Sequence, residues 1–316
     1  MVFVYAVIGL LILLFAGDSL VKGAVNLALR VGISPLIVSL TVVAFGTSAP
    51  ELLISVKAAL EGVPGIAMGN VVGSNTANVL LVLGVPALIA VIHTSRSDTK
   101  KSYLSMMGAT ALFILLAFRG RFDWVSGAIL LTVLVLILAD NVRDALAHRH
   151  NGAAIEDEGD DPEGADPNMP AWKVGIFLII GLIGLPLGAD LLVDSSTQIA
   201  RMFHVPERVI GLTLVAIGTS LPELATTVMA TIRRQADVAL GNVIGSNLFN
   251  LLAIIGVASL ISPIPVDRAF LQFDLWVMLG ASLLLIPFVM FKQDLTRSWG
   301  IVLTGLYALY IIIVLV

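Results

Sequence analysis

The chain has 316 residues, of which 58% are hydrophobic and 13% charged, and its formal net charge is −4. Soluble domains are about 45–50% apolar and about 25% charged, so this composition excludes a soluble globular domain, a DNA-binding protein and a disordered chain. The sequence has no cysteine, which excludes thiol catalysis, cysteine-based zinc sites and disulfides. Its apolar runs are continuous rather than alternating, which disfavours a β-barrel and indicates membrane-spanning helices.

Apolar runs bounded by charged residues, proline or glycine predict an all-α integral membrane protein with ten transmembrane helices. Residues 1–15 contain no Lys or Arg, and no small-x-small cleavage site follows them, so we interpret the first run as a membrane helix rather than a cleaved signal. The predicted spans are 2–28, 34–60, 65–92, 102–118, 123–142, 172–200, 206–232, 237–261, 270–291 and 298–316.

One long hydrophilic stretch, residues 143–170, separates the fifth and sixth predicted spans. It holds seven carboxylates between Glu156 and Asp166, mixed with Gly and Pro, which is typical of a solvated linker. A regulatory calcium site there is a weaker alternative, because the stretch lacks the D-x-D-x-D-G spacing of a calcium loop. The chain is thus predicted to consist of a first five-helix repeat (1–142), an acidic linker and a second five-helix repeat (171–316).

The distribution of Lys and Arg predicts the orientation in the membrane. With the N-terminus outside, eleven basic residues lie at inner ends or in the linker and five lie at outer ends. We therefore expect a multi-pass protein of the plasma (inner) membrane with both termini outside and the acidic linker in the cytoplasm.

An internal repeat is the strongest signal in the sequence. Residues 41–84 align with 213–256 at an offset of 172, without a gap and with 21 identities in 44 positions. The matches include Gly, Thr, Ser, Pro, Glu and Asn, which chance similarity between apolar segments does not produce. Because each half has an odd number of predicted spans, the halves should insert in opposite orientations. Such inverted repeats are typical of secondary transporters, whose substrate sites lie near the bilayer midplane.

The first repeated motif, G-T-S-x-P-E, occupies 46–51 and 218–223, in the middle of predicted spans. Proline lacks an N–H and clashes with the carbonyl four residues upstream, so Pro50 and Pro222 should break their helices and free backbone carbonyls. Irregular backbone at this depth is tolerated where it lines a cavity. The neighbouring hydroxyls belong to Thr47, Ser48, Thr219 and Ser220.

Glu51 and Glu223 end the two copies of this motif. A carboxylate at the bilayer centre costs about 2.5–3.5 kcal/mol or more, and two of them would repel each other. The predicted spans offer few basic partners, so a cation between the two glutamates is the favoured explanation. The alternative is a protonated glutamate bonded to a neighbouring hydroxyl.

The second motif, G-N-x-x-G-S-N-x-x-N, occupies 69–78 and 241–250. Its polar side chains recur every four residues and therefore share one helix face. They could instead be hydrogen-bonding contacts between helices. The favoured ligands are Ser74, Asn78, Ser246 and Asn250, whereas Asn70, Asn75, Asn242 and Asn247 have less weight. An inventory made only of oxygen suits a hard cation such as Ca²⁺, and no histidine lies mid-span.

The two duplicated motifs resemble the α-repeats of the cation/Ca²⁺ exchanger superfamily, most nearly its prokaryotic Na⁺/Ca²⁺ exchangers. The resemblance covers nearly the whole chain. It implies a central Ca²⁺ site on Glu51 and Glu223, with carbonyls at or near Thr47 and Thr219. It implies flanking Na⁺ sites on Ala44, Thr47, Ser48 and Ser74 in one half and on Ala216, Thr219, Ser220 and Ser246 in the other.

The resemblance implies a secondary antiporter that exchanges Na⁺ for Ca²⁺ by alternating access, electrogenically and without a cofactor. Asn78 and Asn250 leave two central carboxylates rather than three, which favours K⁺-independent exchange. The runner-up is H⁺/Ca²⁺ exchange on the same fold, although the G-N-x-x-E-H pattern of that branch is absent. A channel on the same site, or an intramembrane protease, is less favoured, since deep carboxylates in inverted repeats indicate a transporter and protease motifs are missing. We expect no nucleic-acid partner.

Overall fold

The computed structural model describes residues 2–62, 65–150, 166–203 and 216–315. In this part of the chain, seven helices are long and apolar enough to cross a membrane, and one bent helix pair brings the number to eight. The only strands among these residues, β1 (Arg121–Phe122) and β2 (Ile264–Pro265), pair with each other. The predicted all-α membrane architecture is therefore confirmed, while ten crossings remain a prediction.

The helices of the first half coincide closely with the predicted spans. In chain order they are α1 (Val2–Val31), α2 (Pro35–Val38), the π-helix η1 (Ser39–Val43), α3 (Ala44–Thr47), α4 (Ala49–Leu60), α5 (Gly65–Leu80), α6 (Gly84–Ile89), η2 (Thr94–Arg96), α7 (Lys100–Ala117) and α8 (Trp124–His150). Helix α8 continues to His150, beyond the predicted span end at 142 and into the predicted linker. Residues 151–165 of that linker lie outside the described residues.

The second half repeats much of this order. Its helices are α9 (Ala171–Met202), α11 (Ala216–Thr219), α12 (Leu221–Ile232), α13 (Ala236–Leu248), the π-helix η4 (Phe249–Ile254), α14 (Ile255–Ile261), the π-helix η5 (Phe270–Asp274), α15 (Leu275–Leu283), α16 (Ile286–Met290) and α17 (Arg297–Leu315). The first ten residues of the predicted span 206–232 lie outside the described residues.

Both G-T-S-x-P-E motifs interrupt a helix, as predicted. The first bends by 45° between Pro35–Thr47 and Ala49–Leu60. Ser48 occupies the break with φ −84° and ψ 4°, and Ser220 occupies the second break with nearly the same values, −89° and 5°. In each case the proline stands in the first turn of the next helix, where its missing N–H leaves no hydrogen bond unmade.

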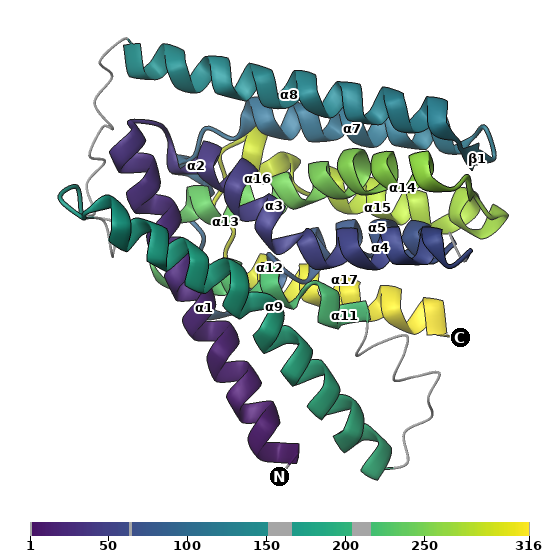
Figure 1. The fold of residues 1–316 in the computed structure, drawn as a ribbon, viewed down its shortest axis with the longest axis horizontal. Coiled ribbons are helices and arrows are strands. Elements are labelled where there is room, and N and C mark those ends of the chain that lie inside the picture. Colours follow the sequence, from purple (N-terminus) through teal and green to yellow (C-terminus); the bar gives the residue numbers. More distant parts are fainter. Residues whose placement is uncertain (1, 63–64, 151–165, 204–215, 316) are drawn as a thin grey trace.

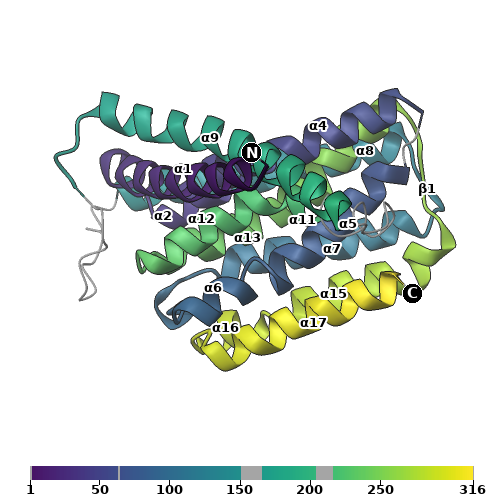
Figure 2. The same cartoon turned by 90° about the horizontal axis from the view of Figure 1, so that it is seen from below.

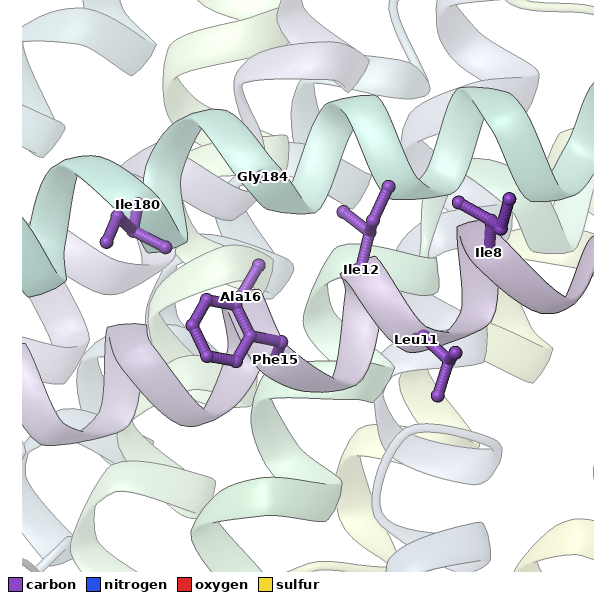
Figure 3. Close-up of a pocket in the computed structure, with 7 residues that line it drawn as sticks. All are labelled: Ile8, Leu11, Ile12, Phe15, Ala16, Ile180 and Gly184. Atoms are coloured by element: carbon purple, nitrogen blue, oxygen red, sulfur yellow. The ribbon is translucent and has the colours of Figure 1, made fainter. Parts of the chain in front are cut away.

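Helices α1 and α9 form a closely packed pair over one face of the molecule. In Figure 2, α9 runs above α1 at the upper left, and α12 and α13 lie below them. Their backbones approach through glycine: a Cβ on Gly181 would lie 2.5 Å from the Cβ of Leu20. The shallow groove between the two helices is lined only by apolar side chains and glycine (Figure 3). Arg233 at the end of α12 forms an ion pair with Asp18 of α1.

The segments that carry the second motif form the centre of the protein. In the most apolar 18-residue stretches of Gly65–Ile89 and Ala236–Ile261, 72% and 78% are buried, whereas the share in Arg297–Val314 at the periphery is 17%. The main apolar core surrounds these two segments and includes residues of α7, α8, α15 and α17. Figure 1 shows α7 and α8 along one edge of this bundle and α1 and α9 along the opposite part. The polar motif residues are therefore held deep in the molecule.

Loops predicted to lie on the same side of the membrane meet in the structure. At one end, Arg121 and Phe122 pair with Pro265 and Ile264. At the other, Ile92 forms a β-bridge with Leu295. The neighbouring His93 Nδ1 lies 2.9 Å from Asp294 Oδ2.

Candidate cation-binding site

The two helix breaks place both glutamates in the buried centre. Glu51 stands in the first turn of α4 and Glu223 in the first turn of α12, and they are 1% and 0% exposed. A helix N-terminus favours negative charge, which helps to hold a carboxylate at each place. Among the described residues, both carboxyl oxygens of Glu51, and Oε2 of Glu223, have no hydrogen-bond partner. Two carboxylates that were both ionised in such a buried site would repel each other.

Hydroxyls from both halves surround Glu223. The Ser48 hydroxyl donates to Glu223 Oε1 at 3.2 Å, and that of Ser246 lies at 3.5 Å from the same oxygen. Thr47 Oγ1 lies 3.4 Å from Ser246 Oγ and donates to the carbonyl of Ala44 at 3.3 Å. The structure thus brings together Ala44, Thr47 and Ser48 from the first half with two predicted residues of the second half.

Other predicted residues place buried polar atoms in the same central segments. In the part of the chain that the structure describes, the side-chain oxygen and nitrogen of Asn250 have no hydrogen-bond partner, and the same holds for the hydroxyl of Ser220. Asn78 donates from Nδ2 to Asn247 Oδ1 at 3.0 Å, which leaves its own oxygen unpaired. Ser74 is buried on α5. Buried polar groups normally have hydrogen-bond partners, so these buried atoms are available to coordinate or hydrogen-bond a ligand.

Two predicted residues belong to α11. Thr219 ends this helix, directly before the break at Ser220, and Ala216 begins it. The side chain of Ala216 lies outside the described part of the structure.

The candidate ligand atoms are oxygens, and the two glutamates supply two negative charges when ionised. Within the described residues, no group of three or more His, Cys, Asp or Glu side chains is close enough to hold a metal ion. Besides the two glutamates, the candidate ligands of this site are hydroxyl, amide and carbonyl oxygens. Sodium and calcium accept such neutral oxygen ligands, whereas zinc, copper and iron prefer nitrogen or sulfur.

Sequence reasoning missed the role of Asn70 and Asn242. The Asn70 side-chain amide donates to the backbone carbonyl of Glu51 at 3.2 Å and to Ser55 Oγ at 3.1 Å. Asn242 makes the equivalent contacts, to the carbonyl of Glu223 at 3.2 Å and to Thr227 Oγ1 at 3.1 Å. These asparagines position the two glutamates. Their spacing of 19 residues after each glutamate, repeated in both halves, is the signal that could have revealed it.

The fold and the site together define a class: a helical membrane protein with an oxygen-lined, doubly acidic site between two broken helices, as in cation transporters. The family described as "Sodium/calcium exchanger protein" matches residues 1–140 and 173–316. The chain belongs to this family, which confirms the resemblance noted in its motifs.

Individual relatives agree with this membership. The chain is 37% identical over 284 residues to "Putative antiporter CaxA" of Alkalimonas amylolytica, covering 90% of this chain and 88% of the relative. It is 31% identical to "Sodium/calcium exchanger MaX1" of Methanosarcina acetivorans, covering 98% and 97%. Among solved structures it matches the sodium-calcium exchanger NCX_Mj, soaked with Na⁺ and Sr²⁺, with a TM-score of 0.83, 33% identity and coverage of 98% and 97%.

Proposed function

We propose that this protein is an electrogenic, K⁺-independent antiporter that exchanges Na⁺ for Ca²⁺ across the membrane. The observation that carries the proposal is the pair of buried carboxylates, Glu51 and Glu223, of whose four oxygens three have no hydrogen-bond partner among the described residues. One Ca²⁺ cancels their charge of −2, and several Na⁺ ions can do the same on overlapping ligands. The two kinds of ion therefore compete rather than bind together.

The proposed ligands follow from this arrangement. Ca²⁺ lies between the glutamates, with backbone carbonyls at Thr47 and Thr219 completing its oxygen shell. The Asn78 and Asn250 side chains face the same centre without adding charge. Na⁺ takes the surrounding oxygens of Ala44, Thr47, Ser48 and Ser74 in one half and Ala216, Thr219, Ser220 and Ser246 in the other.

The same proposal includes ten crossings in two inverted repeats. The equivalent hydrogen bonds of Asn70 and Asn242, at the offset of 172, support it, because one local structure is built twice. We place both termini outside and residues 143–170 in the cytoplasm of the plasma membrane.

Alternating access on this site couples the two fluxes. A site emptied of cations carries two uncompensated carboxylates, which are costly to move within the bilayer. The protein therefore switches the side of the membrane to which its site is open only with Ca²⁺ or Na⁺ bound. This suppresses uncoupled leak of either ion. Rocking of α1 and α9, around Asp18 and Asp190, opens and closes the two sides.

Radiolabelled Ca²⁺ uptake into proteoliposomes tests the proposal. Vesicles loaded with Na⁺ and diluted into Na⁺-free buffer should take up ⁴⁵Ca²⁺, equally with and without K⁺. An inside-positive potential, set with valinomycin, should change the rate, because exchange moves net charge. Uptake that does not depend on the Na⁺ gradient but is driven by an imposed pH gradient would indicate H⁺/Ca²⁺ exchange instead. Flux that needs no counter-ion would indicate a channel.

A further inference from the structure

A second groove lies between α15 and α17, and neither glutamate lines it. It has a volume of about 390 Å³, and Leu80 of α5 contributes to its lining. Phe273, Val277, Gly280 and Leu284 line one wall, and their spacing of four, three and four residues puts them on one helix face. Both walls belong to peripheral apolar helices, so the groove is accessible from the hydrocarbon of the bilayer.

One end of this groove carries a polar pair. Tyr310 lines the groove, and its hydroxyl donates to Asp274 Oδ1 at 3.2 Å. The Phe273 ring stacks on Tyr310 at a centroid distance of 6.3 Å. Within the described residues, no ion pair involves Asp274, and Tyr310 is the side chain that donates a hydrogen bond to its carboxylate. A carboxylate at the edge of the apolar region without a cationic partner is costly, which marks it as a functional group.

We propose that this groove binds a phospholipid with a primary ammonium headgroup. Its ammonium donates to the Asp274 carboxylate beside Tyr310, and one acyl chain lies between α15 and α17. The length fits: from Phe273 to Leu284 the helical rise of 1.5 Å per residue gives roughly 16 Å, about half of the hydrocarbon thickness. Charge complementarity selects the occupant, since an anionic headgroup would be repelled by Asp274.

The groove between α1 and α9 in Figure 3 is a useful comparison for the groove between α15 and α17. That groove also lies between long apolar helices, but no side chain lining it carries a charge or a hydrogen-bonding group. Nothing there distinguishes one headgroup from another. The groove between α15 and α17 differs by the phenol of Tyr310 in its lining and by the Asp274 carboxylate that this phenol contacts.

Native mass spectrometry of the full-length protein tests the proposal, with phosphatidylethanolamine, phosphatidylcholine and phosphatidylglycerol added in turn to delipidated protein. We expect phosphatidylethanolamine adducts to exceed the other two at least fivefold. Gly280→Leu should lower them at least tenfold, because its side chain enters the groove. A Cβ at Gly280 meets no atom within 4 Å, so this variant should fold. Gly305→Leu, on exposed α17 with equal free space, is the matched control and should bind as the unmodified protein does.

Asp274→Asn separates charge recognition from groove filling. It keeps an acceptor for Tyr310 but should reduce phosphatidylethanolamine binding to the level of phosphatidylcholine. The lipid should also raise the melting temperature of the unmodified protein and of Gly305→Leu but not of the other two variants. Equal binding of all three lipids, or phosphatidylethanolamine binding unchanged in Gly280→Leu, would overturn the proposal. A dimer that Gly280→Leu converts to monomer without a change in lipid would instead make the groove a contact between two copies.

Discussion

At the scale of single residues, the charge of the central site depends on Glu51. Its two carboxyl oxygens are buried without a partner, so Glu51→Gln removes half of the negative charge available to a cation. Removing one partner of a buried ion pair, here the carboxylate that faces the proposed cation, costs about 3–5 kcal/mol. We therefore expect Ca²⁺ uptake to fall at least about a hundredfold.

The matched control is Glu61→Gln. Glu61 ends the same helix, and its side chain is 58% exposed beside Lys57. Uptake by this variant should stay within about twofold of the unmodified protein, because exposed ion pairs contribute about 0–1 kcal/mol. Normal Na⁺-driven uptake by Glu51→Gln would show that the cation binds elsewhere.

In the proposed site, Asn242 contacts two candidate ligand residues: its amide nitrogen donates to the Glu223 carbonyl, and its oxygen accepts from Thr47 Oγ1 at 3.2 Å. Asn242→Ala leaves the Glu223 carbonyl and the Thr227 hydroxyl without their donor. A buried group left unpaired costs about 1–3 kcal/mol, so the apparent Ca²⁺ affinity should fall about tenfold, and Asn70→Ala should have a similar effect. Isothermal titration with Ca²⁺ measures this. Thr132→Ala, which removes a hydroxyl bonded only to its own helix, is the control. Unchanged affinity in both asparagine variants would show that the glutamates are positioned without them.

These two kinds of residue differ in how far sequence could predict them. Glu51 and Glu223 are identifiable because a charge in an apolar span needs an explanation wherever the chain folds. The positioning role of Asn70 and Asn242 could not be predicted, because their amides donate to a carbonyl of another helix and that contact exists only after the two helices pack. Residue type at regular spacing identifies a polar face, but it does not say whether that face contacts an ion or a backbone.

At the scale of helices, close packing around the first break depends on Gly245 of α13. A Cβ there would lie 2.7 Å from the backbone carbonyl of Leu40 and 2.6 Å from the Cβ of Ala44. Backbone cannot move aside as a flexible side chain can, so Gly245→Ala should destabilise the protein by about 1–3 kcal/mol. A fluorescence melting curve in detergent should show a fall of several degrees.

Gly108→Ala is the control for this substitution. Gly108 is exposed on α7, and a Cβ there meets nothing within 4 Å. Alanine favours a helix by about 1 kcal/mol over glycine, so the melting temperature should hold or rise. Equal losses in the two variants would show that the effect comes from the glycine substitution itself and not from packing at Leu40.

Helix positions were more predictable than helix details. The breaks at Ser48 and Ser220 follow from proline chemistry, which acts locally, and the structure confirms them. The π-helices η1 and η4 were not predicted, although η4 contains Asn250. A π-turn requires the packing of neighbouring helices to hold one extra residue, and no residue type specifies it alone. The extension of α8 to His150 likewise crosses a polar segment that composition had assigned to the linker.

At the scale of the whole molecule, the duplication made the overall plan predictable. Two copies of one motif, 172 residues apart, must fold alike locally, and the matching asparagine contacts in the two halves show that they do. Composition could not reveal how the halves pack. The ion pair between Asp18 and Arg233, which ties α1 to the end of α12, joins residues 215 positions apart. It has no equivalent in the other half, because Glu61 stands where the repeat would require the arginine.

The proposed topology makes a direct prediction that this chain is well suited to test. It contains no cysteine, so each single-cysteine variant is labelled without background. Arg121 and Asp267 are exposed at the end where β1 meets β2, and Asn168 and Gln293 are exposed at the opposite end. In intact cells a membrane-impermeant maleimide should label Arg121→Cys and Asp267→Cys. It should label Asn168→Cys and Gln293→Cys only after permeabilisation, because the excess of Lys and Arg holds that end inside. The reverse pattern would show that the protein has the opposite orientation in the membrane. Labelling of all four variants in intact cells would show that the two ends do not lie on opposite sides of the membrane.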